Sequence, residues 1–156
     1  MSASIPLNDE DRKPWLEIVR KSAVDSCEKQ LRGEGAPKKR LGVVVGCSAL
    51  KRKYRAVLRG ETQSELEERA DGEGVISTRL TTYFVFINGS HDELMRRMEA
   101  RKDHFMKANM LDSQFRDLES PEGEDGVVVV PLDVTTDEQV RIAKDGLRRM
   151  IDMRME

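Results

Sequence analysis

Three nearly continuous apolar runs, at residues 41–49, 82–88 and 127–134, constrain the fold of this chain most. Apolar residues at almost every position, rather than at every second one, are typical of strands covered on both faces, as in a parallel sheet. Strands of a parallel sheet need long crossover connections, which are usually helices. We therefore predict an α/β fold with a parallel sheet.

Helical patterns stand between and after these runs. They cover residues 51–58, 92–102, 106–118 and 137–150. A further helix opens at Asp9, with acidic residues in its first turn and apolar residues at helical spacing on one face: Trp15, Leu16, Val19, Ala23 and Cys27. The alternation of strands and helices predicts a three-layer α/β domain.

Length and composition limit the number of domains and the classes of partner. The 156 residues fit a single domain, 1–156, with residues 60–79 as a polar, glycine-interrupted surface insertion. The 27 basic and 29 acidic residues leave no positive field for nucleic acid. No apolar run approaches the ~20 residues of a membrane helix, so we expect no membrane-spanning segment. Two cysteines indicate a reducing, cytoplasmic compartment.

Ligands of open parallel sheets bind at the carboxyl ends of the strands, so residues 47–55, 88–91 and 133–137 are the first candidates for a site. In residues 47–55, Ser48 and the cations after it can hold a phosphate or a carboxylate. Alternatively, Ser48 caps a helix whose basic face is solvated.

The strongest basic cluster lies at residues 96–107. Arg97 and Arg101 stand four residues apart and hence share a helix face. One interpretation is a helical lid whose arginines stabilise the charge of a transferred phosphoryl group. The other is a surface helix paired with Glu93 and Glu99. Neither histidine has a neighbour at metal-ligand spacing, so we expect no protein-only metal site.

Four strings, in this order, carry a resemblance to a known family. They are Pro6-Leu-Asn-Asp-Glu-Asp-Arg-Lys-Pro-Trp-Leu, Cys47-Ser-Ala-Leu-Lys-Arg-Lys-Tyr-Arg, Arg101-Lys-Asp-His-Phe-Met-Lys and Met110-Leu-Asp-Ser-Gln-Phe-Arg-Asp-Leu-Glu. Together they resemble gluconokinase, the small P-loop kinase of a sugar acid. The match runs from residue 6 to about residue 147.

The resemblance implies an activity, a fold and a set of site residues. The activity is the ATP- and Mg²⁺-dependent phosphorylation of D-gluconate to 6-phosphogluconate, on a sheet of the nucleoside-monophosphate-kinase type with a helical lid at residues 101–119. It also allows for a homodimer. The residues that it implies are Arg12, Lys51 and Arg55 for substrate, Arg97, Arg101 and Lys102 as catalytic lid cations, His104 and Phe105 in the lid, and Asp133 and Thr135 for the nucleotide.

One departure from the family concerns the phosphate-binding loop. The string Gly-x-x-x-x-Gly-Lys-Ser/Thr occurs nowhere in the chain. In the family that loop follows the first strand, which lies between the strands corresponding to residues 41–49 and 82–88. We therefore expect an incomplete sheet without the P-loop strand and the second strand, and marginal stability.

Three hypotheses follow. The chain is an N-terminally truncated gluconokinase that is inactive alone, or a noncatalytic gluconate-binding or regulatory short form. The third hypothesis is a different kinase of the same superfamily. The strings at residues 7–12 and 47–51 argue against it.

Overall fold

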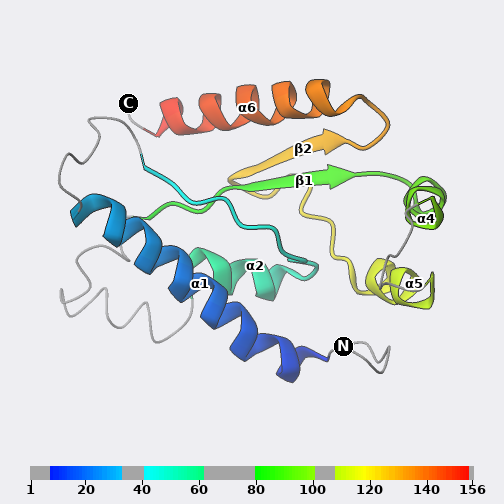
Figure 1. Cartoon of the computed structure of the whole chain (residues 1–156), viewed down its shortest axis with the longest axis horizontal. Helices are drawn as coiled ribbons and strands as arrows, with labels where there is room; N and C mark the ends of the chain where they lie inside the picture. Colours follow the sequence, from blue (N-terminus) through cyan, green and yellow to red (C-terminus); the bar gives the residue numbers. More distant parts are fainter. Residues whose placement is uncertain (1–7, 33–40, 62–79, 101–107, 155–156) are drawn as a thin grey trace. The chain divides into compact units, whose positions relative to one another are not determined.

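The computed structural model describes residues 8–32, 41–61, 80–100 and 108–154 (Figure 1). Their contacts divide the chain into two compact units, one ending at Thr82 and the other continuing from Tyr83. The described residues form five helices and two strands. Each unit is described by itself.

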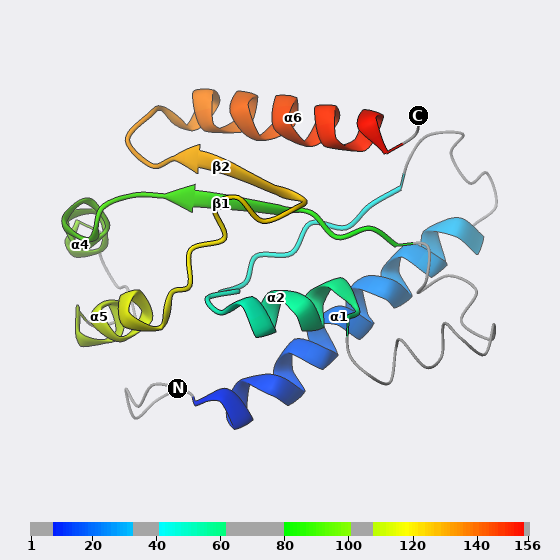
Figure 2. The ribbon, with the colours of Figure 1, turned by 180° about the vertical axis from the view of Figure 1, so that it is seen from behind.

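The second unit contains the sheet. Strands β1 (Phe84–Asn88) and β2 (Val127–Pro131) pair in parallel, with Phe84 opposite Val127 and Asn88 opposite Pro131. Helix α6 (Thr136–Met153) runs alongside β2, and α4 (His91–Glu99) and α5 (Ala108–Asp117) lie beyond the carboxyl end of β1 in both views (Figures 1 and 2). The predicted α/β class and parallel pairing are confirmed, with element ends within three residues of the predicted ones.

Strand β2 supplies the core of this unit. Its side chains are buried together with the residue that follows it: Val127, Val128, Val130 and Leu132. A Cβ at Gly146 of α6 would lie 2.6 Å from Cγ1 of Val128, a separation that real side chains do not tolerate. The missing side chain at this position therefore allows α6 to pack closely on β2.

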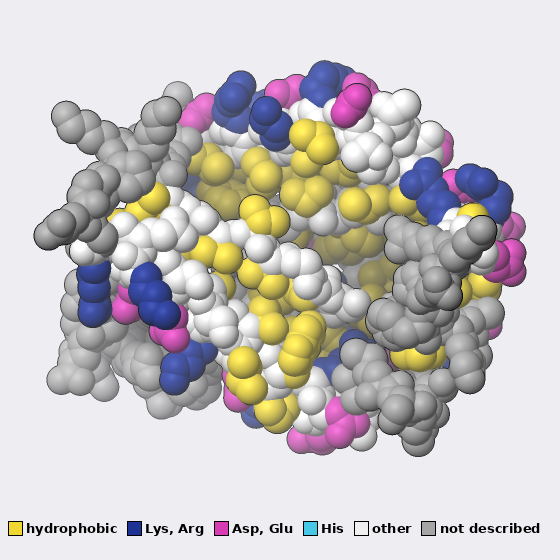
Figure 3. Space-filling view, viewed as in Figure 1, with side chains coloured by type: hydrophobic (Ala, Val, Ile, Leu, Met, Phe, Trp, Pro, Cys, Tyr) yellow, Lys and Arg dark blue, Asp and Glu magenta, His cyan; other side chains and the backbone are white. Residues whose placement is uncertain are grey.

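Strand β1 is covered less completely than β2. The side chains of Val85 and Ile87 are 42% and 49% exposed, and Figure 3 shows hydrophobic side chains at the surface below α6. Within the described residues, β1 pairs with β2 on one edge only. The described sheet thus has two strands where the apolar runs predicted three.

The first unit consists mainly of two helices. Helix α1 (Asp9–Arg32) packs against α2 (Arg52–Arg59), and both views show them side by side (Figures 1 and 2). The apolar face predicted for α1 buries Leu16 and Cys27, whereas Trp15 remains 41% exposed. Helix α2 contributes Tyr54 and Leu58 to the same interior.

The predicted strand at residues 41–49 is wrong. Residues 41–50 form no helix or strand in the described part of the chain, and Val44 is fully exposed. An apolar run becomes a strand only when a neighbouring strand supplies the ladder of hydrogen bonds, and no described strand pairs with this segment. The predicted cap at Ser48 is also wrong, because α2 begins after Lys51, whose side chain makes no capping hydrogen bond.

Some predictions fall partly or wholly outside the described residues. Most of the predicted surface insertion at 60–79 lies outside the described residues. Of the predicted lid at 101–119, residues 101–107 lie outside them, and the described part contains helix α5. The single domain 1–156 likewise stays a prediction. In the described residues, no helix is long and apolar enough to cross a membrane.

Candidate functional site

The start of α1 and the start of α2 bring five side chains together, which we call the Asp9 cluster: Asp9, Arg12, Lys51, Lys53 and Tyr54. Asp9 is the first residue of α1, and Arg12 follows one turn later. Asn8 fixes this start, because its side-chain oxygen accepts a hydrogen bond from the Asp11 N–H at 2.8 Å.

Three donors meet at the carboxylate of Asp9. The Lys51 ammonium lies 3.0 Å from Oδ1 and the Lys53 ammonium 2.5 Å from Oδ2, and the Tyr54 hydroxyl donates to Oδ1. Hydrogen bonds from Lys53, Tyr54 and Lys51 hold the pKa of Asp9 well below its usual range. The Asp9 cluster is thus built to hold a carboxylate in its charged form.

The cations of the Asp9 cluster surround one aromatic ring. Arg12 Cζ and Lys51 Nζ each lie 5.8 Å from the centre of the Tyr54 ring, and Lys53 Nζ lies 6.0 Å from it. These distances are those of cation–π contacts. Three cations against one carboxylate leave the cluster two positive charges in excess, which suits the binding of an anion.

Arg12 and Lys51, two of the three predicted substrate residues, meet in the Asp9 cluster. The third, Arg55, is 1% exposed and donates from Nη1 to the carbonyl oxygens of Ala49 and Leu50, at 2.8 and 3.1 Å. Arg55 therefore fixes the backbone that leads into Lys51. Its predicted contact with substrate stays a prediction.

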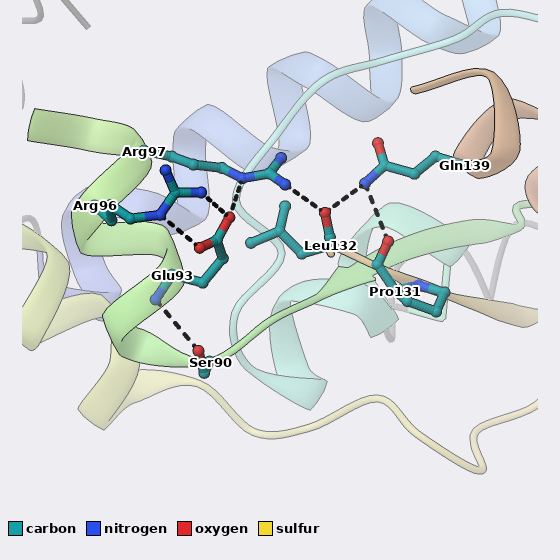
Figure 4. Close-up of polar contacts among 7 residues, drawn as sticks. All are labelled: Ser90, Glu93, Arg96, Arg97, Pro131, Leu132 and Gln139. Atoms are coloured by element: carbon teal, nitrogen blue, oxygen red, sulfur yellow. Dashed lines mark hydrogen bonds and ion pairs between the residues drawn. The ribbon is translucent and has the colours of Figure 1, made fainter. Parts of the chain in front are cut away.

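A second group of polar contacts lies at the carboxyl ends of β1 and β2, in the other unit (Figure 4). Arg97 donates from Nε to Glu93 at 2.6 Å and from Nη2 to the carbonyl oxygen of Leu132 at 2.7 Å. The amide of Gln139 donates to the same oxygen at 3.1 Å and to the carbonyl of Pro131 at 3.0 Å. These contacts join α4, the end of β2 and α6.

The structure thus gives Arg97, a predicted catalytic cation, a structural contact. Arg97 pairs with Glu93, as expected if this segment is a surface helix whose arginines pair with its own acidic residues. The predicted contact of Arg97 with the phosphates of the nucleotide stays a prediction. The other predicted lid residues, Arg101, Lys102, His104 and Phe105, lie outside the described residues.

The predicted nucleotide residues follow β2. Asp133 is exposed, and Thr135 is the N-cap of α6, where its hydroxyl accepts a hydrogen bond from the Glu138 N–H at 3.3 Å. The cap explains why α6 starts at this point. Contacts of both residues with a nucleotide stay predictions.

Helix α4 is joined to α5 by a histidine–carboxylate pair. His91 Nε2 lies 2.7 Å from Oδ1 of Asp112, and the His91 ring meets Phe115 edge-on at 5.0 Å. The hydrogen bond to Asp112 raises the pKa of His91. The described residues include no group of three or more side chains that could hold a metal ion.

The Glu93 contacts predict a pH dependence of stability. Hydrogen bonds from Arg96 and then Arg97 lower the pKa of Glu93 from 4.5 to about 2. A lowered pKa stabilises the folded state above pH 4.5, and this contribution is lost as the pH falls toward 2. We therefore expect Glu93→Gln to melt below the wild type at pH 7, with a difference in Tm that closes between pH 4.5 and 2. Melting curves over this range measure it.

The matched control is Glu99→Gln, which removes the same charge from an exposed position of α4. We expect this variant to follow the wild type at every pH. A Tm difference for Glu93→Gln that stayed constant from pH 7 to pH 2 would contradict the pairing as its cause.

Sequence reasoning missed Asp9, Lys53 and Tyr54. One signal was present, because Asp9 and Arg12 stand three residues apart and so share a face of α1. The pairing of Asp9 with Lys51 joins residues 42 positions apart in the chain, which no local pattern encodes.

The comparisons with known proteins agree on one class and one family. No family model matches the chain. The crystal structure of a gluconokinase from Sinorhizobium meliloti 1021 matches with a TM-score of 0.69 and 35% identity, over 96% of this chain and 69% of that one. This match places the chain in the class of small-molecule kinases.

The relatives by sequence narrow the class. A probable gluconokinase of Saccharomyces cerevisiae is 39% identical over 142 residues, which cover 90% of this chain and 62% of the relative. One of Schizosaccharomyces pombe is 32% identical over 153 residues, which cover 97% and 68%. The chain belongs to the gluconokinase family. It spans less than two thirds of the length of the Saccharomyces cerevisiae relative.

Proposed function

We propose that this chain provides the D-gluconate-binding part of an ATP-dependent gluconokinase, which forms 6-phosphogluconate. The observation that carries the proposal is the Asp9 cluster, in which Arg12, Lys51 and Lys53 surround Tyr54. Their excess positive charge suits the carboxylate of a sugar acid, and family membership supports gluconate as that acid.

The roles within the cluster follow from the chemistry of its donors. The ammonium groups of Lys51 and Lys53 donate to the gluconate carboxylate, and the Arg12 guanidinium donates to the same group or to a neighbouring hydroxyl. Arg55 acts indirectly, because its contacts with Ala49 and Leu50 hold the backbone before Lys51.

Kinases of this family take ATP with Mg²⁺ as the phosphoryl donor, and the bound ion offsets phosphate charge. Arg97, Arg101 and Lys102 are the proposed cations for the phosphates, and Asp133 and Thr135 the proposed nucleotide contacts. The residues present do not provide a complete phosphate site. The loop motif, which supplies the backbone cradle and the lysine for the phosphates, is absent from the sequence. We therefore expect negligible turnover from these 156 residues alone.

The absent loop motif also favours the second candidate function, a noncatalytic gluconate-binding or regulatory protein. Both candidates share gluconate binding and the cytoplasm as location. The two free cysteines, Cys27 and Cys47, suit the reducing environment of the cytoplasm. A homodimer is compatible with either candidate.

Calorimetry and a coupled kinase assay test the proposal. We expect the chain to bind D-gluconate and not D-glucitol, which has the same carbon number and no carboxylate. With ATP, Mg²⁺ and gluconate, we expect no turnover. Absence of gluconate binding would refute the proposed function, and turnover in the ordinary kinase range of ~1–100 s⁻¹ would refute the expected inactivity.

A further inference from the structure

The carboxylate of Asp9 already has the surroundings that a bound sugar acid needs. Both of its oxygens accept hydrogen bonds, Oδ1 from Lys51 and Tyr54 and Oδ2 from Lys53. Two ammonium groups and a phenolic hydroxyl that converge on one carboxylate form a receptor for carboxylates in general. In this structure the carboxylate comes from the chain itself.

We propose that Asp9 is an internal substitute for the ligand, and that the carboxylate of the bound sugar acid displaces it from Lys51, Lys53 and Tyr54. This inference rests on the proposed function and adds to it a residue that sets the affinity. Asp9 competes with the ligand for the same donors, so it weakens the binding of sugar acids.

Two features make the exchange feasible. The Asp9 side chain is 37% exposed, and those of Lys51 and Lys53 are 21% and 59% exposed, so an anion reaches the two ammonium groups from solvent. A displaced Asp9 stays in the first turn of α1, where the helix dipole and water stabilise a negative charge. Release of Asp9 therefore costs less than release of a buried carboxylate would.

The excess positive charge of the Asp9 cluster attracts the incoming anion, and the hydroxyls of a sugar acid favour it over Asp9. With Asp9 in place, the cluster retains an excess of positive charge from Arg12 and the two lysines. On exchange, the carboxylate of the sugar acid replaces that of Asp9 on the same donors, and the hydroxyls of the sugar acid add hydrogen bonds that Asp9 lacks. Against this, Asp9 is tethered to the site and so has a high effective concentration.

The variant Asp9→Asn tests the exchange, because it removes the competing charge and keeps the size of the side chain. We expect it to bind D-gluconate about tenfold more tightly than the wild type in calorimetric titrations, with helix content by circular dichroism unchanged. The matched control is Glu10→Gln, which removes the same charge from an exposed position in the same helical turn. We expect its affinity to equal that of the wild type.

An unchanged or weaker affinity of Asp9→Asn would overturn the inference, while gluconate binding by the wild type would leave the proposed function standing. Equal tightening in Glu10→Gln would also overturn it, because a general charge effect would then explain the result.

The second measurement follows the carboxyl carbon of Asp9 by NMR during pH titrations. Loss of its donors to a ligand is expected to move the pKa of Asp9 up toward its ordinary value when gluconate is added. A pKa that stays low with gluconate bound shows that both carboxylates bind together, which overturns the exchange.

The same titration with acetate separates the two proposals. If neither the wild type nor the Asp9→Asn variant binds gluconate, the proposed function fails. An Asp9 signal that responds to acetate then still supports exchange at a carboxylate site, and one that does not respond overturns it.

Discussion

Replacing Lys51 by methionine is expected to weaken D-gluconate binding by about 10- to 100-fold. Lys51 donates to the carboxylate at the centre of the Asp9 cluster over 3.0 Å, and its side chain is largely shielded from water. Loss of a hydrogen bond to a charged group costs about 1.5–3 kcal/mol, and each 1.4 kcal/mol is a factor of ten in affinity. Methionine keeps most of the apolar stem, so the change isolates the ammonium group.

The control for this prediction is Lys13→Met, which removes one positive charge from an exposed position of α1. Calorimetry of both variants is expected to show a loss for Lys51→Met only. If both variants lost the same affinity, the long-range field of the unit would explain binding better than a direct contact of Lys51. Retention of full affinity in Lys51→Met would remove Lys51 from the site.

Replacing Arg55 by methionine is expected to lower the free energy of unfolding by about 2–4 kcal/mol. Arg55 is 1% exposed, and Nη1 donates to the carbonyl oxygens of Ala49 and Leu50. Methionine removes the charged donor from both carbonyl oxygens, and a hydrogen bond to a charged group contributes about 1.5–3 kcal/mol. Urea unfolding followed by circular dichroism measures the loss.

Arg52→Met is the matched control, because Arg52 is an exposed arginine of the same helix. We expect it to change the free energy of unfolding by less than about 0.5 kcal/mol. The comparison also tests the predicted contact of Arg55 with substrate. A variant Arg55→Met of full stability and reduced gluconate affinity would assign Arg55 to the ligand and contradict its structural role.

The fold was predictable from the sequence wherever a local pattern determined the structure. The periodicity after Asp9 predicted α1, and the apolar runs at residues 82–88 and 127–134 predicted β1 and β2. Residues 41–49 have the same apolar character and form no strand, because a strand also needs a neighbour that pairs with it. The apolar pattern of a segment therefore does not tell whether a second strand lies beside it to form the hydrogen bonds.

The site was predictable only in part, for a related reason. The family strings pointed to Arg12 and Lys51, and the structure brings both to the ring of Tyr54. They gave no means of separating Lys51 from Arg55, four residues away in the same string. Burial separates them, because Arg55 faces the interior and Lys51 is partly open to solvent. Burial depends on how α1 packs on α2, and local spacing does not encode it.

The carbonyl oxygen of Leu132 has a practical consequence of its own. Arg97 of α4 and Gln139 of α6 both donate to this one atom, so its two lone pairs are in use (Figure 4). A shift of either helix changes the polarisation of this peptide group. An isotope label at this carbonyl is therefore a built-in reporter, whose chemical shift follows the movement of two helices in a single resonance.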